Sequence, residues 1–437
     1  MASYIPSTGE ERQAMLQAIG LTSLDQLYDV VPESVRVKDL DLPEGLSELE
    51  VGKVIAGLAG ENRTFKSIFR GAGAYRHYIP SIVKTVTSKE EFLTAYTPYQ
   101  AEISQGVLQS IFEYQTQMCE LTGMDVSNAS VYDGASAAAE AVFMCQERKK
   151  SAVIFSGTVN PQVIRVVKTY CESRQVPVTV IPPKGCATDM EALKAAIADD
   201  TAAVYVQSPN FYGVIEDMDT VVEAAHAKKA KVIMGCNPIS LGLLKTPGEY
   251  GADIAVGEGQ PLGMPLAFGG PYLGFMTCKQ AMMRKLPGRI VGETADHDGN
   301  RCYVLTLQAR EQHIRREKAS SNICSNQALC AMTASVYLAA MGPKGLRQAA
   351  ESSAAHAHYL AEQIAPLGFA LKDDKPFFHE FLTACPVDAD DLCKKLEAKG
   401  ILGGLPVDGG ILWCCTECND KADIDNLVAA LKEVCGK

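Results

Sequence analysis

The sequence lacks the features that would direct it to a membrane or to a nucleic acid. No apolar run approaches the ~20 residues that a membrane-spanning helix needs. The opening residues, MASYIPSTGEERQ, contain neither the basic start nor the apolar stretch of a signal peptide. Acidic residues outnumber basic ones by 52 to 41, and the net charge of −11 opposes attraction to phosphate backbones or anionic lipids. We therefore expect a cytoplasmic protein that binds neither nucleic acid nor membrane.

Aromatic residues are also few, at 7% with a single Trp, yet 47% of the 437 residues are apolar, as in an ordinary globular chain of two or three packed units. Fifteen cysteines are scattered through apolar segments, which indicates reduced, buried thiols. Only Cys415 and Cys418 have C-x-x-C spacing, and the nearest histidine is His379. Zinc would need two more ligands, so we predict a Cys-rich strand end and no metal site.

Hydrophobic periodicity predicts an N-terminal helical arm and one long helix. An arm with helical spacing over residues 24–31 ends at Pro32, and a connection through Pro43 follows. A long helix is expected from Thr97 to Thr122, since Thr97 can cap it, Pro98 suits its first position and Gly123 is a stop signal.

The middle of the chain alternates short β-branched runs with helical patterns. This alternation predicts parallel βαβ crossovers, and the near-continuous apolar runs predict a sheet covered on both faces. The expected strands are residues 152–155, 178–181, 202–207 and 231–234, and the expected helices are residues 161–173, 190–198 and 218–229.

The C-terminal part predicts a smaller α/β domain. Helical patterns at residues 326–340 and 346–364 precede the strand-like segments FFHEFLTAC, ILGGLPV and ILWCC and a helix near residues 423–434. We divide the chain into an N-terminal helical arm and interface segment (1–95), a large α/β domain (96–340) and a small C-terminal α/β domain (341–437). Many enzymes that hold pyridoxal phosphate have this layout, which is the α/β architecture called fold type I, with a mainly parallel sheet in the large domain.

One candidate anion site begins the Ala-rich segment after Asp133. Gly134 and Ser136 open a helix there, and the exposed N–H groups of a helix start can hold a phosphate. The alternative is a helix start with a Ser cap and no ligand.

Two groups that pyridoxal chemistry requires are missing. A Lys must form the Schiff base, and an acid must keep the pyridine nitrogen protonated. The stretch 232–241 (VIMGCNPISL) contains no Asp or Glu, and the stretch 251–270 (GADIAVGEGQPLGMPLAFGG) contains neither Lys nor His. Lys245 and Lys279 lie outside it. By itself the chain therefore has the pattern of a pyridoxal enzyme without its covalent chemistry.

Several long motifs in order carry a family resemblance. They are GAGAYRHYIP (71–80), YTPYQAEISQG (96–106), LTGMDVSNASVYDGASAAAEA (121–141), GADIAVGEGQPLGMPLAFGGPYLGF (251–275) and REQHIRREKASSNICSNQ (310–327). Together they closely resemble the glycine decarboxylase P-protein family, in its N-terminal half, which many bacteria make as a separate alpha subunit. The similarity runs from the opening residues to about Leu338 and is weaker beyond.

The resemblance implies a subunit of the glycine cleavage system. In that family a companion beta subunit carries the Schiff-base Lys, so pyridoxal phosphate is expected to be bound covalently by the partner and not by this chain. The two chains are expected to form an α2β2 heterotetramer that decarboxylates glycine and passes the aminomethyl group to the lipoyl arm of the H-protein. An inert scaffold that only stabilises the beta subunit and docks H-protein is the alternative, while an independent decarboxylase or aminotransferase is disfavoured by the missing Lys.

Two groups of residues are candidates for a shared active site. The first is the polar and aromatic start of the long helix, whose members are Tyr96, Tyr99, Gln100, Glu102 and Gln105. The alternative for them is interface packing and capping. Tyr75 and His77, in a loop entered through Gly71 and Gly73, are candidates for hydrogen bonding or proton transfer. The alternative for His77 is a structural role in an ordered loop.

A basic segment in this acidic chain is the candidate docking site for H-protein. Its four cations outnumber the neighbouring Glu311 and Glu317, and they are Arg310, Arg315, Arg316 and Lys318. Such a patch can steer an acidic partner. The alternative is a solvated helix face with internal ion pairs.

Overall fold

The computed structural model describes residues 7–37 and 39–436. The chain forms two compact units, Met1–Arg63 and Thr64–Lys437. Residues 64–95, which we grouped with the arm, lie in the second unit, where β1 (Ser67–Ile68) pairs in parallel with β14 (Ile401–Leu402). In the described part of the chain, no helix combines the length and the apolar character that crossing a membrane requires.

The first unit consists of short helices. These are α1 (Gly9–Ala18), η1 (Leu24–Tyr28), η2 (Glu33–Val35) and α2 (Glu48–Gly60). Capping boxes at Thr8 and Ser47 fix the starts of α1 and α2. The helix expected over residues 24–31 is shorter than predicted, because a 3-10 turn replaces it and ends before Pro32.

Helix α2 carries an apolar stripe that its own unit leaves exposed. Val51, Val54, Ile55 and Leu58 recur at the i, i+3, i+4, i+7 spacing of one helical face, and they are 43%, 52%, 58% and 57% exposed. A stripe of this kind is stable in water only when something covers it.

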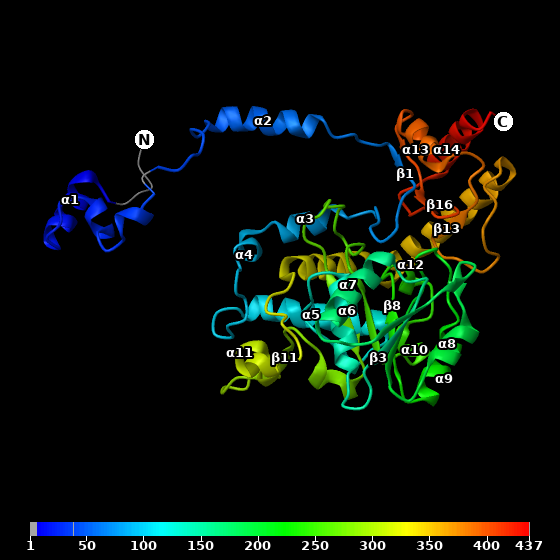
Figure 1. Ribbon diagram of the computed structural model, residues 1–437, viewed down its shortest axis with the longest axis horizontal. Coiled ribbons are helices and arrows are strands. Elements are labelled where there is room, and N and C mark those ends of the chain that lie inside the picture. The colour runs from blue at the N-terminus through cyan, green and yellow to red at the C-terminus, as the bar shows by residue number, and fades with distance from the viewer. Residues whose placement is uncertain (1–6, 38, 437) are drawn as a thin grey trace. The chain divides into compact units, whose positions relative to one another are not determined.

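The second unit is built around a seven-stranded sheet (Figure 1). In spatial order its strands are β2 (Val126–Ser127), β10 (Gly274–Cys278), β9 (Ile254–Glu258), β8 (Lys231–Gly235), β7 (Thr201–Gln207), β3 (Ala152–Ser156) and β4 (Val178–Ile181). The strands from β9 to β4 are mutually parallel, and β10 runs antiparallel to both of its neighbours. The parallel crossovers predicted from the sequence are confirmed.

Alternate residues of each strand enter two separate cores. Ile154, Val204 and Met234 pack in one core, while Val153, Ala203 and Ile233 pack in the other. The first core is covered by α5 (Gln105–Thr122), α8 (Met190–Ala196), α9 (Met218–Ala227) and α12 (Ala328–Ile364). The second is covered by α6 (Gly134–Cys145) and α7 (Pro161–Ser173). Both faces of the sheet are therefore buried, as the continuous apolar strands predicted.

Helix α5 differs from expectation at its start. It ends before Gly123 as predicted but begins at Gln105 and not at Thr97, because Tyr99 and Ala101 pack into a small core with Leu108 and hold the preceding segment in turns.

The two helices expected at 326–340 and 346–364 are confirmed as the two halves of α12. They are separated by a kink where Gly342 adopts a non-helical conformation, with φ 60°, immediately before Pro343.

The small C-terminal domain has its own core. An antiparallel sheet of β13 (Glu380–Thr383), β16 (Gly410–Cys414) and β15 (Leu405–Val407) packs with α13 (Ala389–Glu397) and α14 (Lys421–Val434) around the fully buried Trp413. The second half of α12 contributes Leu360 and Ile364 to this core and so joins the small domain to the large one (Figure 1).

The other elements are short connections. They are α3 (Ser81–Thr87), α4 (Glu90–Leu93), β5 (Pro183–Lys184), β6 (Ala187–Thr188), η3 (Ser240–Gly242), α10 (Pro247–Tyr250), η4 (Gln280–Lys285), β11 (Val291–Ala295), β12 (Arg301–Leu305), η5 (Gln308–Arg310), α11 (Gln312–Arg315), η6 (Arg316–Lys318) and η7 (Ala365–Leu367).

Candidate active site

A cavity of about 440 Å³ opens at the carboxyl ends of the parallel strands. Gln207 ends β7, Asn237 follows β8 and Glu258 ends β9, and all three line it. The start of α6 and the loop Gly71–Tyr75 form other walls. Open α/β sheets bind their ligands at this edge, so this cavity is the candidate site.

The start of α6 in this cavity is already hydrogen-bonded to the chain's own carboxylates. Asp133 accepts a hydrogen bond from the N–H of Ser136 at 2.7 Å, and Glu258 Oε2 accepts one from the N–H of Gly134 at 3.1 Å. A Cβ atom on Gly134 would lie 2.8 Å from the Glu258 nitrogen. The predicted anion site at Gly134 and Ser136 is therefore occupied on two of its N–H groups, whether or not it also binds a ligand.

Glu258 is the most perturbed acid of the cavity. Its Oε1 atom accepts hydrogen bonds from Leu273 N at 2.9 Å and from Gln260 N at 3.1 Å. Burial nevertheless outweighs these hydrogen bonds and raises the pKa of Glu258 to about 7, and the negative charge of Asp133 acts in the same direction.

The loop Gly71–Tyr75 is fixed to the small domain by a buried carboxyl group. Glu380, on β13, accepts hydrogen bonds from Ala72 N at 2.6 Å and from the Tyr75 hydroxyl at 2.7 Å. Burial raises the pKa of Glu380 to about 7 and, together with the charge of Glu380, raises the pKa of Tyr75 well above its ordinary value. Tyr75 therefore lies at the cavity wall as a hydrogen-bond donor.

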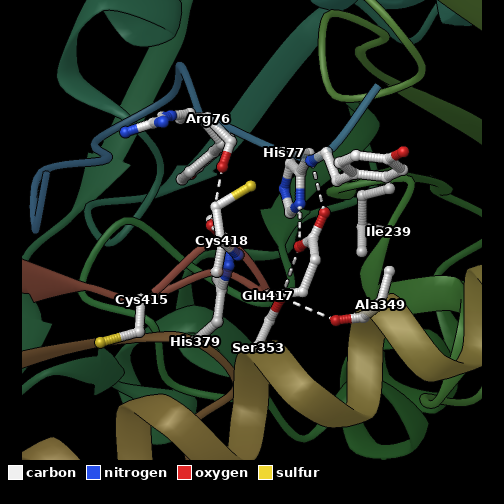
Figure 2. Close-up of polar contacts among 12 residues, drawn as sticks. Arg76, His77, Ile239, Ala349, Ser353, His379, Cys415, Glu417 and Cys418 are labelled. Carbon is white, nitrogen blue, oxygen red and sulfur yellow. Dashed lines mark hydrogen bonds and ion pairs between the residues drawn. The ribbon is translucent and has the colours of Figure 1, made fainter. Parts of the chain in front are cut away.

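His77 is not among the residues that line the cavity and takes part in a second contact of this loop with the small domain (Figure 2). Its Nδ1 atom is 2.7 Å from Glu417 Oε2, and Glu417 also accepts hydrogen bonds from Tyr78 N at 2.7 Å and from the Ser353 hydroxyl at 3.2 Å. Burial acts to raise the pKa of Glu417, but the hydrogen bond and charge of His77 outweigh it, and the net shift is downward. The His77 side chain is 1% exposed and stacks near His379, whose pKa burial holds well below its ordinary value. This geometry favours the structural alternative for His77.

The start of α5 lies apart from the cavity. Tyr96 is 93% exposed, and Gln100 and Glu102 are exposed as well. Tyr99 and Gln105 instead hold the fold together: the Tyr99 hydroxyl bonds to Asn326, and the Gln105 amide exchanges hydrogen bonds with the backbone of Tyr303 at 2.9 and 2.8 Å. The structure therefore does not bring these five predicted residues to the same place as Tyr75 and His77.

The basic segment is divided between interior and surface. Arg310 is partly buried and donates to Gly288 O at 2.8 Å, and burial lowers its pKa to about 10. Arg315, Arg316 and Lys318 are exposed. Arg289 connects this segment with the start of α5, because it pairs with Glu311 and lies 5.1 Å from the centre of the Tyr99 ring.

The cavity can bind a ligand by hydrogen bonds but offers no amine for a covalent bond. Among the described residues, no Lys lines it, and its only cation is Arg165, which is exposed. Lys245 pairs with Asp219 at 2.7 Å, and Lys279 donates to Gly251 O at 2.6 Å, away from the lining. Nor do the described residues contain a group of three or more His, Cys, Asp or Glu side chains that could hold a metal ion.

Glu258, Glu380 and Glu417 were not predicted from the sequence. Glu258 ends β9, Glu380 begins β13 and Glu417 lies in the loop after β16, and their partners lie 124, 308 and 340 residues away in the sequence. For Glu258 alone a signal existed, since it ends the strand at which the missing Lys was sought.

Comparisons with known proteins agree over nearly the whole chain. The model of the family described as glycine cleavage system P-protein matches residues 2–431. The probable glycine dehydrogenase (decarboxylating) subunit 1 of Desulfitobacterium hafniense is 50% identical, with 99% of this chain and 100% of that protein covered. The protein of the same name from Moorella thermoacetica is 48% identical, with 99% of each covered.

Solved structures agree as well. A crystal structure of glycine decarboxylase (P-protein) of the glycine cleavage system, in inhibitor-bound form, superposes with a TM-score of 0.93 at 43% identity, covering 99% of this chain and 100% of that one. A sphingosine-1-phosphate lyase of Burkholderia pseudomallei, 13% identical with a TM-score of 0.67 over 92% of this chain and 93% of its own, shares the fold alone. The fold is therefore that of pyridoxal-phosphate-dependent enzymes of fold type I, as predicted. The family model, the bacterial relatives and the solved P-protein structure each match nearly the full length of this chain. The chain therefore belongs to the glycine cleavage system P-protein family.

Proposed function

We propose that this chain is the alpha subunit of a cytoplasmic α2β2 glycine dehydrogenase. A Lys-bearing beta subunit holds pyridoxal phosphate covalently, glycine is decarboxylated there, and the aminomethyl group passes to the lipoyl arm of H-protein. The observation that carries the proposal is the cavity at the strand ends, which has the position of an active site but no Lys in its described lining. A relative named subunit 1 fits a chain that completes a partner's site.

The residues of this chain do not fit the cofactor itself. The carboxylates of Asp133 and Glu258 occupy N–H groups that would hold a phosphate, and Asn237 follows β8 in the segment where an acid was sought. We therefore assign no chemical step to this cavity. The contribution of the chain is a surface for the partner, for which its exposed apolar and aromatic residues are the candidates, among them Tyr96, Ile103 and Phe268 at 93%, 78% and 95% exposure.

Tyr96 distinguishes a shared active site from an inert scaffold. If Tyr96 forms a wall of the partner's site, Tyr96→Ala should lower turnover of the reconstituted complex by about tenfold or more, which corresponds to about 1.4 kcal/mol of transition-state stabilisation. Because this side chain is almost fully exposed, its removal should not unfold the chain.

The matched control is Leu371→Ala, which removes an exposed apolar side chain from another part of the second unit. Assembly of both variants is checked by gel filtration with the beta subunit. Full turnover of an assembled Tyr96→Ala complex would favour the scaffold over the shared site. His77→Ala is a poor test, because it would leave the partly buried Glu417 without its ion-pair partner.

We propose Arg315 and Arg316 as the docking site for H-protein. Both are exposed and lie on or beside α11, whereas the guanidinium of the partly buried Arg310 is engaged by Gly288 O. Opposite charges across an interface accelerate the encounter, and this acceleration weakens as salt screens it.

Replacing both arginines by Glu should therefore raise the apparent KM for H-protein about tenfold at low salt, with a smaller effect at high salt. The control replaces Lys394 and Lys432 by Glu, since these exposed cations of the small domain give the same change in net charge. If assembly is normal and the apparent KM is the same for both double variants, the basic segment is only a solvated surface.

A further inference from the structure

The start of α6 differs from an open anion site in both charge and space. Two N–H groups of its first turn, those of Gly134 and Ser136, already bind carboxylates at 3.1 and 2.7 Å. The carboxylate of Glu258 also accepts hydrogen bonds from Leu273 N and Gln260 N, so it is held from three sides. A helix start attracts an anion because its N–H groups lack hydrogen-bond partners. Here the N–H groups of Gly134 and Ser136 already have partners within the chain.

The first residue of α6 packs tightly against the backbone at the end of β9. A Cβ atom on Gly134 would approach the Glu258 nitrogen to 2.8 Å and the Gly257 carbonyl carbon to 2.9 Å. The carboxyl end of β9 therefore lies directly against the first residue of α6. A phosphate at Gly134 would have to displace the Glu258 side chain, and it would meet the charge of Asp133 as well.

We infer that Glu258 closes this chain's own phosphate site and is the residue that prevents it from binding pyridoxal phosphate. The missing Lys removes the covalent bond, but a cofactor can still bind through its phosphate when the Lys is absent. The carboxylate of Glu258 removes that second mode of binding. The inference deepens the proposed function, on which its biological meaning rests, because it explains how one chain of the pair leaves the cofactor to the other.

Removal of the carboxylate should restore an anion site. Glu258→Ala leaves three N–H groups, those of Gly134, Leu273 and Gln260, without the carboxylate that accepts their hydrogen bonds. Glu258→Gln is the matched control, because its amide oxygen can still accept the Gly134 hydrogen bond and its volume still fills the space.

The experiment is equilibrium dialysis of the full-length chain, without partner, against inorganic phosphate and pyridoxine phosphate, with pyridoxine as the ligand that lacks the phosphate. Pyridoxine phosphate has no aldehyde, so surface lysines cannot capture it. We expect the wild type and Glu258→Gln to retain neither phosphate ligand at about 1 mM, and Glu258→Ala to bind both at least about tenfold more tightly, with no gain for pyridoxine.

Specific binding of either phosphate ligand by the wild type would overturn the inference, and this measurement needs no variant that folds. A folded Glu258→Ala chain, verified by circular dichroism, that gains no phosphate binding would overturn it too. Neither outcome involves the beta subunit or turnover, so failure here is distinguishable from failure of the proposed assembly.

Discussion

Leu58→Asp in α2 is expected to weaken association with the beta subunit by about a hundredfold, or about 3 kcal/mol. Leu58 lies in the stripe of Val51, Val54, Ile55 and Leu58, which its own unit leaves exposed. Burial of one Leu in an interface contributes about 2 kcal/mol, and an unpaired carboxylate in its place adds a desolvation cost. Analytical ultracentrifugation of the mixed chains measures the change.

Leu49→Asp is the matched control in the same helix. Leu49 is more exposed than Leu58, at 70% against 57%, but it lies on the opposite face of α2 and outside the stripe. An Asp in the first turn also suits the helix dipole, so the control should not unravel the helix. Equal affinities of the two variants and the wild type for the beta subunit would show that the stripe does not form the interface.

Helices and strands that are determined by neighbouring residues, such as caps and apolar runs, could be predicted from the sequence. Helix Pro161–Ser173 has the expected bounds, since Asn160 caps it and Pro161 begins it, and the parallel strands β3, β4, β7 and β8 lie within one or two residues of expectation. The predicted start of α5 was wrong because Tyr99 packs into a small core with Leu108 and bonds to the distant Asn326, contacts that no local pattern of capping residues reveals.

The site was only partly predictable for the same reason. The absence of a Lys near β9 could be read directly from the sequence, and so could the family. The closure of the α6 start by Glu258 could not be predicted from the sequence, because it depends on how β9 is placed against a helix start 124 residues away. Likewise, His77 has the sequence appearance of a catalytic residue, and only its burial against Glu417 indicates a structural role.

The largest effect we expect is the loss of glycine decarboxylation when this chain is assayed without its partner. No described Lys lines the cavity, and Lys245 and Lys279 are engaged elsewhere. This chain alone, with pyridoxal phosphate and lipoylated H-protein present, should therefore decarboxylate glycine at least about a hundredfold more slowly than the mixture of both subunits.

Release of labelled CO2 from carboxyl-labelled glycine is measured for each subunit alone and for the mixture, followed by borohydride reduction and peptide mapping. We expect full activity only in the mixture, with the reduced cofactor attached to a Lys of the beta subunit. Turnover by this chain alone, with the cofactor fixed to one of its own lysines, would contradict it.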